Sequence, residues 1–184
     1  MSKKVFVFLA PGFEEVEAIT PIDVLRRAGL DVTTVSITDD RKVVGSHHIE
    51  VVSDVLLSEI DLGRADVLLL PGGMPGTNNL NACGVLKAAL VEHSAKNKLV
   101  AAICAAPLVL GELGLLDGHT ATCYPGHEPR LKGANVTSNQ VEVSLPFVTG
   151  RGAGASMEFS LTLVTLLAGS KTAGELAAKM MVLR

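Results

Sequence analysis

The chain has 184 residues, of which 48% are hydrophobic, 19% charged and 3% aromatic, and its formal net charge is −3. This length predicts one domain that spans residues 1–184, and the low charged fraction favours an oligomer that covers part of the surface. Interspersed charges argue against nucleic-acid binding, which needs clustered Lys and Arg, and no apolar run is long enough to cross a bilayer.

Segments of helical spacing alternate with apolar runs that Gly or Pro residues bound. In chain order, the predicted elements are a strand at 5–9, a helix at 14–28, a strand at 32–37, a hairpin of 42–46 and 49–52, a strand at 66–70, a helix at 85–95, a strand at 99–103, a helix ending at 113, a strand-rich stretch at 120–149, and helices at 157–167 and 173–180. This alternation predicts an α/β fold with a doubly wound, mostly parallel sheet between helices.

The cysteines and the N-terminal segment indicate in which cellular compartment the protein is expected. Cys83, Cys104 and Cys123 form no close pair and no Cys/His pattern of a zinc site. An odd number of isolated cysteines suits a reducing compartment. The apolar run after Lys4 ends at Pro11, too early for a signal peptide. We therefore expect a cytoplasmic protein with no disulfide and no bound metal.

The ligand site of a doubly wound sheet lies beyond the carboxyl ends of its strands. Three segments reach that edge in the predicted fold, namely 10–17, 71–73 and 103–106. Each follows a predicted buried strand and carries Gly, Ala, Cys or Glu residues. We expect the functional site where these three segments meet.

Cys104 is the principal candidate for chemistry. It follows a predicted strand and precedes a predicted helix, between the small residues Ala102 and Ala105. Small neighbours allow a sharp turn that presents a side chain, as in a nucleophile elbow, and a helix N-terminus favours a thiolate. The same pattern fits a buried structural cysteine equally well.

The predicted position of Glu17 favours a reactive Cys104 over a buried structural cysteine. Glu14, Glu15 and Glu17 fall in the first turn of the predicted helix, where two of them are expected to be solvated. Helical periodicity directs Glu17 towards the sheet edge instead. A carboxyl group beside a thiolate has a raised pKa and can donate a hydrogen bond to sulfur, or act as an acid or base.

Other motifs carry weaker signals. Gly72 and Gly73 follow a strand and could aim backbone N–H groups at an anion, although a plain tight turn has the same pattern. The loose GxGxxA at 150–155 comes too late for a dinucleotide fold, so we expect no cofactor. No histidine can be placed beside Cys104 from its position in the sequence.

Four blocks of sequence together resemble the DJ-1 branch of the ThiJ/PfpI superfamily, in a bacterial-type form. They occur in the same order and at matching separations, and the similarity covers essentially the whole chain. The blocks are Ala10-Pro-Gly-Phe-Glu-Glu-Val-Glu17, Leu70-Pro-Gly-Gly73, Val100-Ala-Ala-Ile-Cys-Ala-Ala-Pro107 and Thr149-Gly-Arg-Gly-Ala-Gly154.

This resemblance implies a flavodoxin-like sandwich of the class I glutamine amidotransferase type, assembled as a homodimer. It implies that Cys104 is a nucleophilic, oxidisable cysteine and that Glu17 is its protonated partner. The backbone at Gly73 and Ala105 would form an anion-binding pocket.

The chain also departs from its relatives. Peptidase-like members have His where this chain has Ala105, so we do not expect a peptidase. Tyr124 stands where the animal proteins have His, and His47 stands where relatives have an arginine that reaches across the dimer. Gly72, Tyr124 and Arg151 are further candidate pocket residues.

Three functions are compatible with this resemblance. One is a cofactor-independent glyoxalase or deglycase that acts on methylglyoxal, other α-oxoaldehydes or glycated adducts through Cys104 and Glu17. Another is a redox sensor in which Cys104 is oxidised to sulfenic and sulfinic acid. A third is a chaperone-like protein in which the cysteine is incidental. Some relatives are linked to thiazole monophosphate synthesis, and nothing in these residues suggests that chemistry.

Overall fold

The computed structural model describes residues 2–182. The strands are β1 (Lys4–Leu9), β2 (Asp31–Ser36), β3 (Lys42–Val44), β4 (Glu50–Val52), β5 (Val55–Leu56), β6 (Val67–Leu70), β7 (Leu99–Ile103), β8 (Thr120–Thr122), β9 (Asn135–Thr137), β10 (Val141–Ser144) and β11 (Phe147–Gly150). The helices are α1 (Glu15–Arg27), α2 (Gly76–Ala82), α3 (Gly84–Ala95), α4 (Pro107–Glu112), α5 (Ser156–Ala168) and α6 (Ser170–Lys179). Short 3₁₀ turns occupy Leu57–Glu59, Leu62–Arg64, Glu128–Arg130 and Ala153–Ala155.

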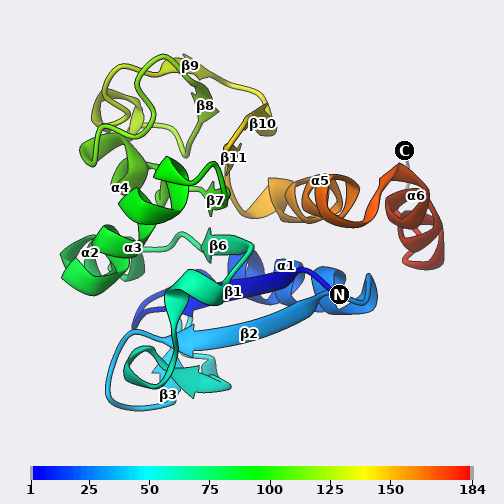
Figure 1. The fold of residues 1–184 in the computed structure, drawn as a ribbon, viewed down its shortest axis with the longest axis horizontal. Coiled ribbons are helices and arrows are strands. Elements are labelled where there is room, and N and C mark those ends of the chain that lie inside the picture. The colour runs from blue at the N-terminus through cyan, green and yellow to red at the C-terminus, as the bar shows by residue number, and fades with distance from the viewer. Residues whose placement is uncertain (1, 183–184) are drawn as a thin grey trace.

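Seven strands form the main sheet in the order β10-β11-β7-β6-β1-β2-β5 (Figure 1). Neighbouring strands are parallel throughout, except that β10 runs antiparallel to β11. The central strands β1, β6 and β7 are almost entirely buried, as expected for parallel strands covered on both faces. The predicted α/β fold with a mostly parallel sheet is therefore confirmed.

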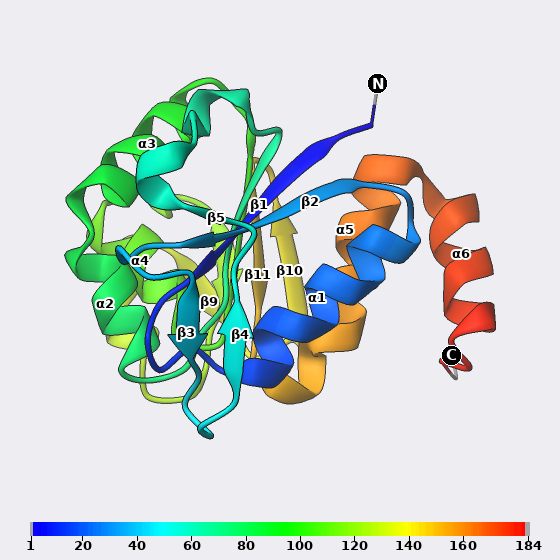
Figure 2. The same cartoon turned by 90° about the horizontal axis from the view of Figure 1, so that it is seen from below.

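Helices cover both faces of the sheet and create two separate cores. α1, α5 and α6 lie on one face and α2, α3 and α4 on the other (Figure 2). Side chains alternate along a strand. Val7 of β1 therefore packs into the core between the sheet and α1, α5 and α6, and Phe8 packs into the core on the opposite face. Both cores are apolar, so burial on the two faces stabilises the sheet that carries the site.

Two elements were not expected from the sequence. β5 is only a short edge strand, and α2 has the sequence GTNNLNA, whose Gly, Thr and Asn residues have low helix propensity. The predicted hairpin is present as β3 paired with β4, with Val43 opposite Val51. Among residues 2–182, no helix is both long and apolar enough to span a membrane.

Candidate active site

Cys104 lies immediately after β7, at the carboxyl end of a central parallel strand. Its φ of +64° places it in the left-handed region, which costs about 1–3 kcal/mol for a residue with a Cβ atom and persists only when the surroundings impose it. Two backbone hydrogen bonds do so. The Cys104 N–H donates to the Gly150 carbonyl at 2.9 Å, and its carbonyl accepts from the Tyr124 N–H at 2.8 Å. The cysteine is thereby held between β11 and the loop after β8.

Glu17 reaches the same edge from the first turn of α1. It is 1% exposed, and its Oε2 accepts a hydrogen bond from the Gly72 N–H at 3.0 Å. Its carboxyl group lies beside Cys104, and each of the two groups contributes to the pKa shift of the other. Glu17 therefore points inwards to the sheet edge, as helical periodicity predicts.

Two glycines after β6 permit this close approach. A Cβ atom on Gly72 would lie 2.5 Å from Glu17 Oε2 and 2.6 Å from Cys104 Cβ. Gly73 has a φ of +89°, and a Cβ atom there would lie 2.7 Å from the carbonyl oxygen of Gly12. Any larger residue at either position would push the loop away from the cysteine.

Cys104 and Glu17 titrate as a coupled pair. Burial raises the pKa of Glu17 to about 7, and the charge of Glu14 adds to this rise. Burial also raises the pKa of the Cys104 thiol to about 12, and the neighbouring Glu17 carboxylate contributes. Because each group contributes to the pKa shift of the other, the two protons are lost from the pair, and the first loss leaves a single proton on it.

The expectation that a helix N-terminus stabilises a thiolate at Cys104 is wrong. α4 begins only at Pro107, and the cysteine sits in the turn before it, where the helix dipole has little effect. Instead, the nearby backbone N–H groups of Gly73 and Ala105 lower the pKa of the Cys104 thiol against the larger effect of burial. These N–H groups are suited to an anion that forms at the sulfur or on an atom bonded to it.

An open cavity of about 450 Å³ lies above the cysteine. The residues that line it are Glu14, Glu17, His47, Gly73, Met74, Cys104, Ala105, Tyr124, His127 and Ala153. Tyr124 is 53% exposed, and its ring centroid lies 6.4 Å from that of His127. The sequence did not place His127 at the site, because the loop after β8 has no periodicity from which to locate it.

Two candidate residues lie outside this lining. Gly72 contributes its N–H to Glu17 rather than to the cavity wall. Arg151 follows β11, where its backbone N–H donates to the Gln140 carbonyl, and its charge acts on Cys123 and Glu128. Neither residue therefore lines the cavity at Cys104.

Glu15 is buried rather than solvated, which corrects the expectation for this helix turn. It is 6% exposed. Its carboxylate accepts the His47 backbone N–H at 2.7 Å and lies 3.0 Å from His47 Nδ1. Burial would raise the pKa of Glu15, but these hydrogen bonds outweigh it and hold the pKa at about 2. His47 is thus the ion-pair partner of an acid in its own chain, and its own pKa is raised.

Glu14, Glu15 and His47 are also the residues most able to hold a metal ion. One donor atom from each lies within 4.8 Å of the others. The same atoms, however, already form the contacts between the imidazole and the two carboxylates. These contacts account for the cluster without a metal.

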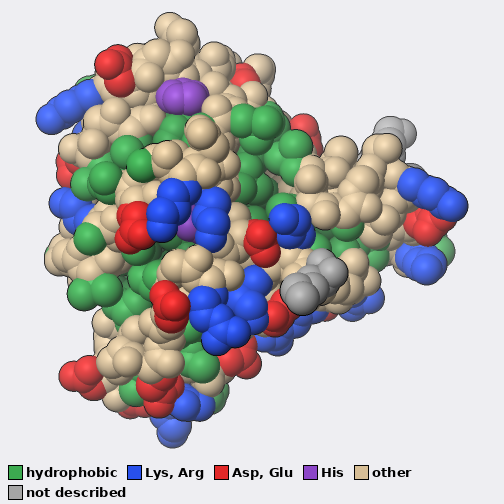
Figure 3. Space-filling view, viewed as in Figure 1, with side chains coloured by type: hydrophobic (Ala, Val, Ile, Leu, Met, Phe, Trp, Pro, Cys, Tyr) green, Lys and Arg blue, Asp and Glu red, His purple; other side chains and the backbone are tan. Residues whose placement is uncertain are grey.

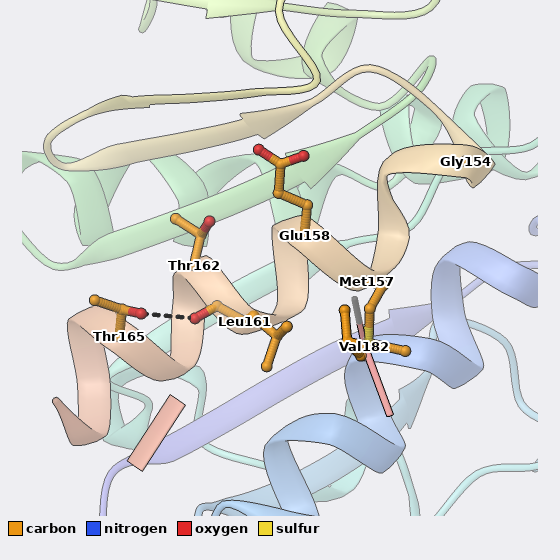
Figure 4. Close-up of a pocket in the computed structure, with 7 residues that line it drawn as sticks. All are labelled: Gly154, Met157, Glu158, Leu161, Thr162, Thr165 and Val182. Carbon is orange, nitrogen blue, oxygen red and sulfur yellow. Dashed lines mark hydrogen bonds between the residues drawn. The ribbon is translucent and has the colours of Figure 1, made fainter. Parts of the chain in front are cut away.

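A larger hollow, of about 520 Å³, lies along α5 (Figure 4). The hydroxyl of Thr165, one of its residues, donates to the Leu161 carbonyl at 2.9 Å, and Glu158 is the one titratable side chain among the described residues that line it. No cysteine or histidine of residues 2–182 joins Glu158 there. On chemical grounds, the smaller cavity at Cys104 is therefore the candidate active site.

The surface does not suggest a polyanion site on the face shown in Figure 3. Lys and Arg side chains are interspersed with Asp and Glu on that face. Such a mixed surface lacks the basic stripe that phosphate binding needs.

Cys104 lies in a left-handed turn at the carboxyl end of a central parallel strand, beside the buried carboxyl group of Glu17. This arrangement defines a class of α/β proteins whose site is centred on a cysteine. Residues 3–166 match the model of the DJ-1/PfpI family. The chain belongs to this family, as its four sequence blocks had indicated.

Known relatives agree with this assignment. Protein dj-1beta of Drosophila melanogaster is 36% identical over 184 residues, which make up 99% of this chain and 98% of that protein. Its crystal structure matches with a TM-score of 0.96 at 35% identity, and the match covers 100% of each chain. DJ-1 of Toxoplasma gondii, solved in an oxidized form, matches with a TM-score of 0.92 at 36% identity over 98% of each chain.

A plant relative is longer than this chain. Protein DJ-1 homolog B of Arabidopsis thaliana is 42% identical over 183 residues, which make up 98% of this chain but 42% of that protein. The chain spans less than half the length of both Arabidopsis homologs, A and B.

Proposed function

We propose that this protein is a cofactor-independent enzyme that converts α-oxoaldehydes such as methylglyoxal into hydroxy acids, with glycated adducts as related substrates. The observation that carries the proposal is the buried carboxyl group of Glu17 beside the Cys104 thiol, beneath an open cavity. A nucleophile with an adjacent proton carrier is what addition to a carbonyl group requires.

The reaction begins when the Cys104 thiolate attacks the aldehyde carbon. A carbon–sulfur bond forms, and the electron pair of the C=O bond moves to oxygen, which takes the proton of Glu17 to give a hemithioacetal. The N–H groups of Gly73 and Ala105 stabilise the oxyanion. Glu17, now a carboxylate, removes the proton from the former aldehyde carbon and delivers it to the adjacent carbon, while the hydroxyl proton of the hemithioacetal moves to the neighbouring ketone oxygen. The resulting thioester is hydrolysed by water, which releases the hydroxy acid and returns the thiol.

The test is formation of lactate from methylglyoxal by the wild-type protein, without glutathione and in the presence of EDTA. We expect lactate in amounts that far exceed the amount of protein, because the net reaction adds only water. Proton NMR measures both compounds in one sample. Loss of methylglyoxal without lactate would show that the thiol merely binds the aldehyde, and would contradict the proposed turnover.

Redox sensing is a second candidate, favoured by the same N–H groups and by the oxidized form in which Toxoplasma gondii DJ-1 was solved. We expect hydrogen peroxide to add two oxygen atoms to Cys104 as a sulfinic acid, which Glu17 can bond as a donor. Cys83 and Cys123 lie outside the cavity and should remain reduced. Peptide mass spectrometry locates the added mass, and faster oxidation of Cys83 or Cys123 would refute a sensor centred on Cys104.

A homodimer remains part of the proposal. Val16 and Ile19 of α1 are exposed apolar side chains, which a second copy of the chain would cover. Such an interface would lie on the same helix as Glu17.

A further inference from the structure

Apart from Cys104 and Tyr124, the ionisable side chains that line the cavity are acids and histidines. Glu14 and Glu17 contribute carboxyl groups, and His47 and His127 contribute imidazoles. No Lys or Arg from residues 2–182 belongs to this lining. An anion that enters the cavity therefore finds no permanent positive charge from the described residues.

Glu14 is the carboxylate whose field reaches the reacting groups. Its side chain is 18% exposed, so solvent screens it only partly. It lines the same cavity as Glu17 and Cys104, and its charge contributes to the raised pKa of Glu17. The Ser46 hydroxyl donates to Glu14 Oε2 at 3.1 Å and helps to hold the carboxylate at the cavity.

His47 does not cancel this negative charge. Its Nδ1 lies 3.0 Å from Glu15 Oε2 and 3.5 Å from Glu14 Oε2. One protonated imidazole can balance only one of these two carboxylates. The cluster therefore stays net negative whichever protonation state His47 adopts.

The backbone donors serve a different part of the substrate. The N–H groups of Gly73 and Ala105 lower the pKa of the Cys104 thiol, and they are therefore available to the oxygen of the carbonyl group under attack. The remainder of the substrate must extend into the cavity lined by Glu14. A carboxylate or phosphate on that remainder would face a like charge.

We propose that Glu14 is a specificity-determining residue that makes this cavity prefer uncharged α-oxoaldehydes over anionic ones. This inference rests on the proposed function. It assigns the carboxylate a role in substrate selection that is separate from the covalent chemistry of Cys104.

The experiment compares 4,5-dioxopentanoate with its methyl ester as substrates for the wild type, Glu14→Gln and Glu175→Gln. The first substrate is an anionic α-oxoaldehyde that yields 2-hydroxyglutarate, and the ester is its uncharged counterpart. Glu175→Gln is the control, because Glu175 lies on α6 and outside the cavity lining. For each protein the measured quantity is kcat/KM for the ester divided by kcat/KM for the anion. Dividing the ratio of one protein by that of another cancels the differences between the two substrates in aldehyde hydration and intrinsic reactivity.

Loss of one like charge at close range should reduce the ester preference about five- to tenfold in Glu14→Gln, with no change in Glu175→Gln. Added salt should also reduce the wild-type preference, because it screens the charge, and this measurement does not depend on the folding of any variant. An unchanged preference in Glu14→Gln, together with no salt effect on the wild type, would overturn the inference while the proposed function stands. If neither substrate is converted by the wild type, the proposed function fails and the inference fails with it.

Discussion

Glu17→Gln is expected to lower kcat/KM for methylglyoxal by about 100-fold or more, the usual contribution of a positioned acid or base. Glutamine fits the same buried space and can still accept the hydrogen bond from the Gly72 N–H, so the loop geometry should be retained. It cannot take the proton from the Cys104 thiol or move a proton between the substrate carbons. The measurement is the rate of lactate formation over a range of pH.

The pH profile separates proton transfer from a structural effect. In the wild type, kcat/KM should rise as pH increases through about 7, the pKa of Glu17, because the first proton lost from the pair leaves the form in which Glu17 can take the proton of the thiol. In Glu17→Gln the thiol titrates alone, and burial still raises its pKa, so the rise should move to higher pH. Glu175→Gln is the matched control. A Glu17→Gln protein with wild-type rates and a rise near pH 7 would remove Glu17 from the mechanism.

Cys104→Ser is expected to lower lactate formation by about 1,000-fold or more, since covalent catalysis is lost with its nucleophile. A serine hydroxyl has no accessible anionic form near neutral pH, although it can still hydrogen-bond to Glu17. Serine also tolerates the φ of +64° at this position as well as cysteine does. The matched control is Cys83→Ser, because Cys83 lies between α2 and α3, outside the cavity lining.

Much of the framework of this site follows from local sequence pattern. The runs that became β1, β6 and β7 are apolar at nearly every position, and this pattern predicts parallel strands with both faces buried. Parallel strands align their carboxyl ends, so Cys104 and Gly72 could be assigned to the same edge of the sheet. Glu17 could be assigned to that edge too, because helical periodicity predicts which side of the helix faces it.

The electrostatics of the site could not be predicted in this way. Glu15 is buried because it hydrogen-bonds to His47, which lies far along the chain in the turn between β3 and β4. Helical periodicity carries no information about such a partner. The raised pKa of Cys104 depends on burial and on distance to Glu17. His127 reaches the cavity from an irregular loop, whose path depends on tertiary packing rather than on propensity.

The most direct test of the account is lactate formation from methylglyoxal, without glutathione, by wild type, Cys104→Ser and Cys83→Ser side by side. The account predicts repeated turnover by the wild type and Cys83→Ser, and no lactate above the uncatalysed rate from Cys104→Ser. Equal lactate formation by Cys104→Ser and the wild type would show that the thiol beside Glu17 is not the nucleophile, and would contradict the central claim.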